Sequence, residues 1–311
     1  MSGDFRSSPV SSPPQGVPGE PLLADLADAP RRRQLGRLAG VLCILLMIGL
    51  VVGPVLYVEL PREIARWHIA AALEKRLAGD LDGAIQSLDK ALEKFPGNDE
   101  LYRQLASWRL ASRQYEAGLA DANRAVALAP NGSEAYFVRS QLFQRLGRHT
   151  EAIADWNTVV RLAETEGGFA AAVGLNGRAY ARAVGGIQLK EALADVEQAL
   201  RQAGDNAAML DTRGFIRYLQ GDDATARADL EKAVRMVEGE HEALMRLAED
   251  GRTRSSDPRE FELQLHEHAE NVAVIRYHRA LIYDQLGEKA KAEEDRRRVR
   301  ELGFEPNERL F

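Results

Sequence analysis

Histidine and carboxylate side chains are the first in this sequence whose types could do chemistry, because together they bind zinc and related metals. They gather at His266, Glu267 and His268. Residues two apart on a helix point to different sides, and the residue four positions after His266 is Glu270. We therefore expect solvent-facing histidines at this place and no metal site.

Other catalytic signatures are missing from the sequence. The one cysteine, Cys43, has no partner for a zinc pair or an intrachain disulfide, and the bulky Leu42 before it argues against lipidation. There is no glycine-rich phosphate loop and no dinucleotide fingerprint. We expect no catalytic residue, no cofactor and no small-molecule substrate, and an enzyme with an unrecognised site is the least favoured alternative.

Aspartate recurs along the chain at regular intervals. A single active site explains such a recurrence poorly, because the residue repeats with a structural unit. We expect either a solvated face or hydrogen bonds between neighbouring helices. The positions are Asp121, Asp155, Asp195, Asp229 and Asp295.

The recurring aspartates belong to a longer pattern that repeats every 34 residues. Ala84, Gly118 and Ala152 share one slot at this spacing, and Ala106 and Ser140 share another. A unit of this length made of two short amphipathic helices resembles the tetratricopeptide repeat. The resemblance implies an all-α solenoid of about six helix pairs, in which small residues in these two slots face each other where paired helices cross.

The units can be placed along the chain from this pattern. Units 1 to 3 are predicted over 65–163, units 4 and 5 over 169–236, and unit 6 with a C-terminal cap over 272–311, with a charged insertion over 237–271. The spacing slips near 164–168, and the continuity of the stack there and across the insertion is left open. In unit 2, Arg113 replaces the turn glycine, which predicts a strained or differently shaped turn.

The N-terminal part has a different composition. Residues 1–37 are rich in proline and serine and end in an arginine cluster, which predicts a disordered tail. Residues 38–60 are predominantly apolar, and a helix of that length reaches about 34 Å, so we expect one transmembrane helix. The arginine cluster predicts a cytoplasmic N-terminus, with the repeats on the far side of the membrane and periplasmic in a bacterium.

The resemblance also implies where partners bind. In this family, certain positions of each first helix line a groove for a peptide or a partner helix, and aromatic side chains among polar groups are typical of interfaces. Carried over, these positions predict a partner-binding groove of Arg103, Ser107, Phe137, Gln141, Asp211, Phe215, Tyr218 and Tyr277.

The predicted function is a non-enzymatic, membrane-tethered scaffold that binds proteins or peptides, in cell-envelope assembly or secretion. The net charge of −6 argues against nucleic acid as a partner. A cytosol-facing repeat receptor at a membrane is the main alternative. The identity of the partner and the oligomeric state are not predicted.

Overall fold

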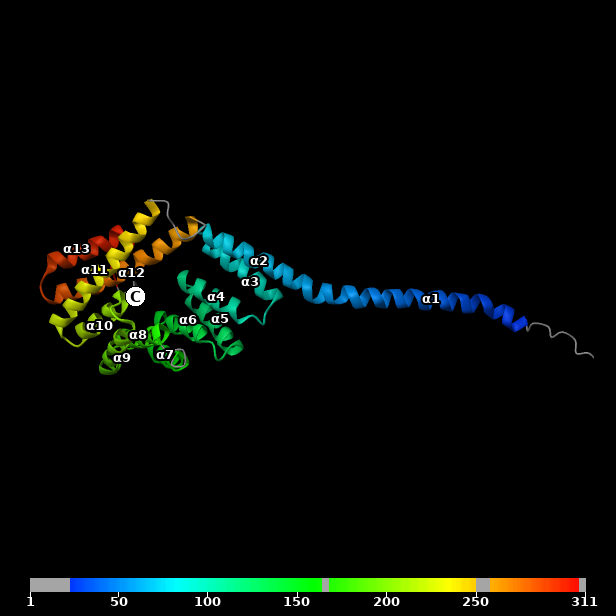
Figure 1. Cartoon of the computed structure of the whole chain (residues 1–311), viewed down its shortest axis with the longest axis horizontal. Coiled ribbons are helices and arrows are strands. Elements are labelled where there is room, and N and C mark those ends of the chain that lie inside the picture. Colours follow the sequence, from blue (N-terminus) through cyan, green and yellow to red (C-terminus); the bar gives the residue numbers. More distant parts are fainter. Residues whose placement is uncertain (1–22, 164–167, 250–257, 308–311) are drawn as a thin grey trace, which may run out of the picture. The chain divides into compact units, whose positions relative to one another are not determined.

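The computed structural model describes residues 23–163, 168–249 and 258–307, and all regular structure among these residues is helical (Figure 1). The all-α prediction is confirmed. The chain divides into two compact units, Met1–Pro61 and Arg62–Phe311, which we describe separately. The disorder predicted for residues 1–22 and the joint predicted at 164–167 lie outside the described residues.

The N-terminal unit consists of α1 (Leu23–Pro54) and a short π-helix, η1 (Val55–Glu59). The predicted disordered tail is therefore wrong for residues 23–37, because this stretch is rich in Leu, Ala and Arg, which are good helix formers. The large apolar side chains of α1 between Leu38 and Val52 are exposed.

The transmembrane prediction for residues 38–60 is not supported by the structure. Within the residues that it describes, no helix combines the length and the apolar character that crossing a bilayer requires.

The second unit is a series of helix pairs, in which each helix is followed after a short turn by its partner (Figure 1). Six such pairs lie in the described residues, as the 34-residue pattern predicts. They are α2 (Leu60–Leu77) with α3 (Leu81–Lys94), α4 (Asp99–Ala111) with α5 (Tyr115–Leu128), α6 (Ser133–Arg145) with α7 (His149–Ala163), α8 (Gly168–Val184) with α9 (Leu189–Ala203), α10 (Ala207–Leu219) with α11 (Asp223–Glu249), and α12 (Pro258–Gln285) with α13 (Lys289–Glu301).

The predicted insertion at 237–271 is largely helical. α11 continues to Glu249 and α12 begins at Pro258, so the two helices lengthen the fifth and sixth pairs. Val272 and Ile275 of α12 pack with Val234 and Val237 of α11 in one apolar cluster. The pairs on either side of residues 164–167 also pack directly, because Val160 of α7 shares a cluster with residues of α8 and α9. The stack therefore continues past both places.

Small residues let the paired helices approach closely. The alanines of the two predicted slots, such as Ala84, Ala106 and Ala152, are fully buried, which confirms the slots. Gly177 is partly exposed, yet a Cβ atom added to it would overlap the indole ring of Trp156. A Cβ at Gly214 would lie 2.7 Å from Cγ of Leu230. Larger side chains in these slots would push the helices apart.

The turns within the pairs share one backbone geometry. Gly79, Gly147, Gly221 and Gly287 have positive φ angles between 70° and 80°, and the next residue in each case donates its N–H to the carbonyl five residues earlier. Arg113 takes the same role with φ 61°, so the turn keeps its shape and Arg113 is strained. A non-glycine residue held in this region costs about 1–3 kcal/mol.

Buried arginine–aspartate ion pairs join the two helices of each pair from the second to the sixth. The aspartates lie on the second helix and are buried, so the prediction of hydrogen bonds between neighbouring helices is confirmed. The pairs are Asp121 with Arg109, Asp155 with Arg139, Asp195 with Arg178 and Arg182, Asp229 with Arg213 and Arg217, and Asp295 with Arg276 and Arg279.

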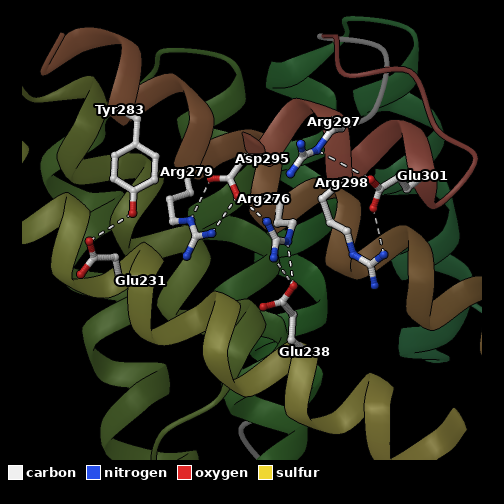
Figure 2. A network of polar contacts seen from close by, with 9 residues as sticks. All are labelled: Glu231, Glu238, Arg276, Arg279, Tyr283, Asp295, Arg297, Arg298 and Glu301. Atoms are coloured by element: carbon white, nitrogen blue, oxygen red, sulfur yellow. Dashed lines mark hydrogen bonds and ion pairs between the residues drawn. The ribbon is translucent and has the colours of Figure 1, made fainter. Parts of the chain in front are cut away.

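Bidentate geometry strengthens the ion pairs of the third to the sixth helix pairs. Arg139 donates from Nε and Nη2 to the two carboxylate oxygens of Asp155, at 2.7 Å each, and this hydrogen bonding raises the pKa of Arg139. Figure 2 shows the corresponding site of the last pair, where Arg279 and Arg276 converge on Asp295 and Arg276 also reaches Glu238 of α11.

Several of the arginines that pair with these buried aspartates also form a hydrogen bond to the preceding helix pair. Arg109 donates to Asp89 at 2.9 Å, Arg139 to Asn123 at 3.0 Å and Arg178 to Asn157 at 3.1 Å. One guanidinium therefore holds its own pair together and connects it to the pair before.

We predict that Asp155→Ala lowers the free energy of unfolding by about 3 kcal/mol, because it leaves the guanidinium of Arg139 in a buried place without its carboxylate. Chemical denaturation of the purified chain measures this change. The double variant R139M/D155L should recover most of the loss, since an apolar pair of similar volume needs no counter-charge. A single variant as stable as the parent chain would contradict the role of the ion pair.

Candidate functional site

The structure brings part of the predicted groove together in a hollow of about 470 Å³, which we call the first hollow. Its walls come from α4, α6, α7 and α8. They contain the predicted residues Arg103, Ser107 and Phe137. The remaining lining residues are Gln104, Ser133, Glu134, Val138, Val159, Ala163, Ala170, Val173 and Gly174.

The lining of the first hollow is mostly apolar and includes two charged side chains. Phe137 packs edge-on against Trp156, with ring centroids 5.3 Å apart, so its ring is held in place. Arg103 pairs with Glu100 on its own helix, and Glu134 places a carboxylate among the lining residues. Such a surface suits an apolar side chain flanked by polar groups of a polypeptide.

A second hollow, of about 840 Å³, contains the other predicted aromatic residues. Phe215 and Tyr218 of α10 and Tyr277 of α12 line it, together with Val184, Leu219 and Leu281. The remaining wall comes from the turns of the second and third pairs, with Arg113, Tyr115, Gln144, Arg145 and Gly147. Sequence reasoning missed these residues, because the predicted groove left out the turns and, in the third pair, the last residues of the first helix. The sequence feature that could have indicated this part of the lining was Arg113, which stands at a turn position where other pairs have glycine.

Two of the predicted groove residues lie elsewhere. Asp211 is buried, and its carboxylate lies 2.9 Å from Nδ1 of His278 on α12, so it is not on the open face where we expected it. The reason is that the sixth pair covers α10, with Phe215 stacked on the His278 ring at 4.4 Å. Gln141 is half-buried and lines neither hollow.

The histidine cluster differs in part from its prediction. His266 and Glu267 are exposed, but His268 is half-buried and stacks on His241 of α11, with centroids 5.7 Å apart. In the described residues, no group of three or more His, Cys, Asp or Glu side chains is arranged to hold a metal ion.

We predict that the helix extensions at His241 lose stability as the pH falls below about 6.5. Burial lowers the pKa of His241, and the neighbouring His268 and Arg298 lower it further against the opposing effect of Glu238 and Glu242. The unfolded chain therefore takes up this proton first, and stability is lost as the pH falls from the unfolded pKa towards the folded one. Thermal melts between pH 7.5 and pH 5.5 measure the slope.

The variant His241→Gln removes this proton-binding site and should flatten the slope. A variant with the same pH dependence as the parent chain would show that other groups set it.

Comparisons with known proteins agree with the helix pairs. The family model described as tetratricopeptide repeat matches residues 133–166. Protein STIP1 homolog of Dictyostelium discoideum is 34% identical over 73 residues, which are 24% of this chain and 13% of that protein. Tetratricopeptide repeat protein 28 of Mus musculus is 37% identical over 76 residues, which are 24% of this chain and 3% of that protein. The match thus spans a small fraction of the length of either relative.

Among solved structures, PilW, described as a widely conserved type IV pilus biogenesis factor, superposes with a TM-score of 0.55. The match covers 79% of this chain and 96% of that chain at 16% identity. At this level of identity the likeness shows the fold.

Proposed function

This chain is a tetratricopeptide-repeat protein, and from that premise we propose that it is a non-enzymatic scaffold that binds a polypeptide segment in the first hollow. The observation that carries the proposal is the composition of this hollow, where a fixed aromatic ring and aliphatic side chains lie beside Arg103 and Glu134. A segment with one apolar anchor and polar flanks matches such a surface.

The half-buried Ser107 offers a sharp test, since it lines the hollow on α4. We predict that Ser107→Arg reduces recovery of the partner in a crosslinking pull-down about tenfold or more, because the longer side chain occupies the space of the anchor. Ala154→Arg places the same side chain on the exposed face of α7, outside both hollows, and should leave recovery unchanged.

Circular dichroism of both variants checks that the helices persist. Equal recovery with Ser107→Arg and Ala154→Arg would place the binding surface elsewhere.

We also propose that α1 attaches the chain to a membrane and that the scaffold serves cell-envelope assembly or secretion. The exposed apolar side chains of α1, including Leu42, Leu46 and Leu50, support attachment, since water is an unfavourable surrounding for so many of them. The arginines before them favour a cytoplasmic N-terminus with the repeats beyond the membrane. A cytosol-facing receptor is the alternative orientation.

Protease treatment of intact cells and of spheroplasts measures the orientation. We predict that the repeats are cleaved only in spheroplasts, while a tag at the N-terminus survives in both. Repeats protected in spheroplasts and cleaved only after lysis would support the cytosol-facing alternative. Full release of the chain from membranes by alkaline carbonate would contradict attachment.

A further inference from the structure

The second hollow has an unusual charge distribution. Its lining includes two arginines, Arg113 and Arg145, and no aspartate or glutamate. Within the described residues, neither guanidinium has an ion pair, whereas Arg109 and Arg139 on the first helices of the same two pairs are each bonded to a carboxylate. The two positive charges therefore face a space that holds no counter-charge from the chain.

The backbone gives a second, independent observation. Arg113 is held at φ 61°, in a turn slot where the first, third, fifth and sixth pairs have glycine. Glycine adopts this conformation without strain, so the arginine lowers the stability of the turn. Strained residues of this kind gather at functional sites, where the side chain contributes something other than stability. Here the strained position is the one that brings a guanidinium to the hollow.

The other lining residues of this hollow restrict the kind of ligand. Much of the lining of the second hollow is apolar or aromatic, with Phe215, Tyr218, Tyr277, Val184 and Leu281. The volume of about 840 Å³ exceeds what a small inorganic anion fills. A long polyanion such as nucleic acid fits poorly, because its binding needs many cationic contacts and the chain has a net charge of −6.

We propose that the second hollow binds an acidic polypeptide segment, whose carboxylates pair with Arg113 and Arg145 while an aromatic or aliphatic side chain of the same segment packs on Phe215 and Tyr218. This rests on the proposed function in that the ligand is a polypeptide. The site is separate from the first hollow, since no residue lines both.

The strained arginine allows a test in which stability and binding move in opposite directions. Arg113→Gly relieves the strain and removes the charge. We expect the melting temperature to rise by about 2–4 °C and the affinity for an acidic peptide to fall about tenfold. Arg113→Ala also removes the charge but keeps a side chain at the strained φ angle. Its affinity for the acidic peptide should therefore fall about tenfold, as for Arg113→Gly, while its melting temperature should not rise.

The probe is a fluorescein-labelled peptide of about twelve residues, rich in aspartate with two phenylalanines, titrated into the purified full-length chain and followed by fluorescence anisotropy. The same peptide with asparagine for aspartate tests the need for charge, and a phosphoserine version distinguishes phosphate from carboxylate. Arg145→Gln should weaken binding about tenfold. Arg124→Gln, at an exposed position of α5 that lines neither hollow, serves as the matched control and should leave it unchanged.

Binding of the aspartate peptide that Arg113→Gly and Arg145→Gln each weaken supports the proposal. Equal binding of the asparagine peptide, or affinity unchanged in both arginine variants, overturns it. A preference for the phosphoserine peptide over the aspartate peptide overturns the assignment to carboxylates. Because Ser107→Arg lies outside this hollow, it should leave the peptide affinity unchanged, so failure here is distinguishable from failure of the scaffold proposal.

Discussion

The close approach of paired helices is the constraint on which this structure depends. Each pair buries little apolar surface alone, so its two helices must come near enough to share a core with the next pair. Fully buried alanines, with Gly214 where α10 meets α11, permit that distance. Once the helices are close, an arginine of the first reaches a buried aspartate of the second, and the ion pair then fixes how the two helices are aligned.

The repeating parts of the fold could be predicted from the sequence because the same physical demand recurs at each repeat. The 34-residue period located the helix pairs, the small residues located the crossings, and Gly79 or Gly147 located a turn. The aspartates were found as a recurrence, but their arginine partners were not, because those arginines occupy different slots about one helical turn apart, as Arg139, Arg109 and Arg276 do.

The site was less predictable because it depends on how distant pairs meet. First-helix positions identified Arg103, Ser107 and Phe137 in the first hollow, where neighbouring pairs form the wall. The same rule failed for Asp211, since nothing local shows that His278, 67 residues later, covers it. It also missed Arg145, which meets Tyr277 across a hollow only after several pairs have stacked. Residues 23–37 were misassigned because the prolines of the tail outweighed the helix formers after them.

Arginines such as Arg139 bond both within their own helix pair and to the preceding pair, and this affects how the number of pairs can change. Arg139 meets its buried charge partner inside its own pair, and its bond to the pair before goes to Asn123, whose side chain is exposed. Removing or duplicating the third pair would therefore leave no buried carboxylate without its partner in the remaining ones, whereas the buried Asp211 of the fifth pair depends on His278 of the sixth. Evolution could lengthen or shorten this part of the array by entire units, each of which neutralises its own buried charge.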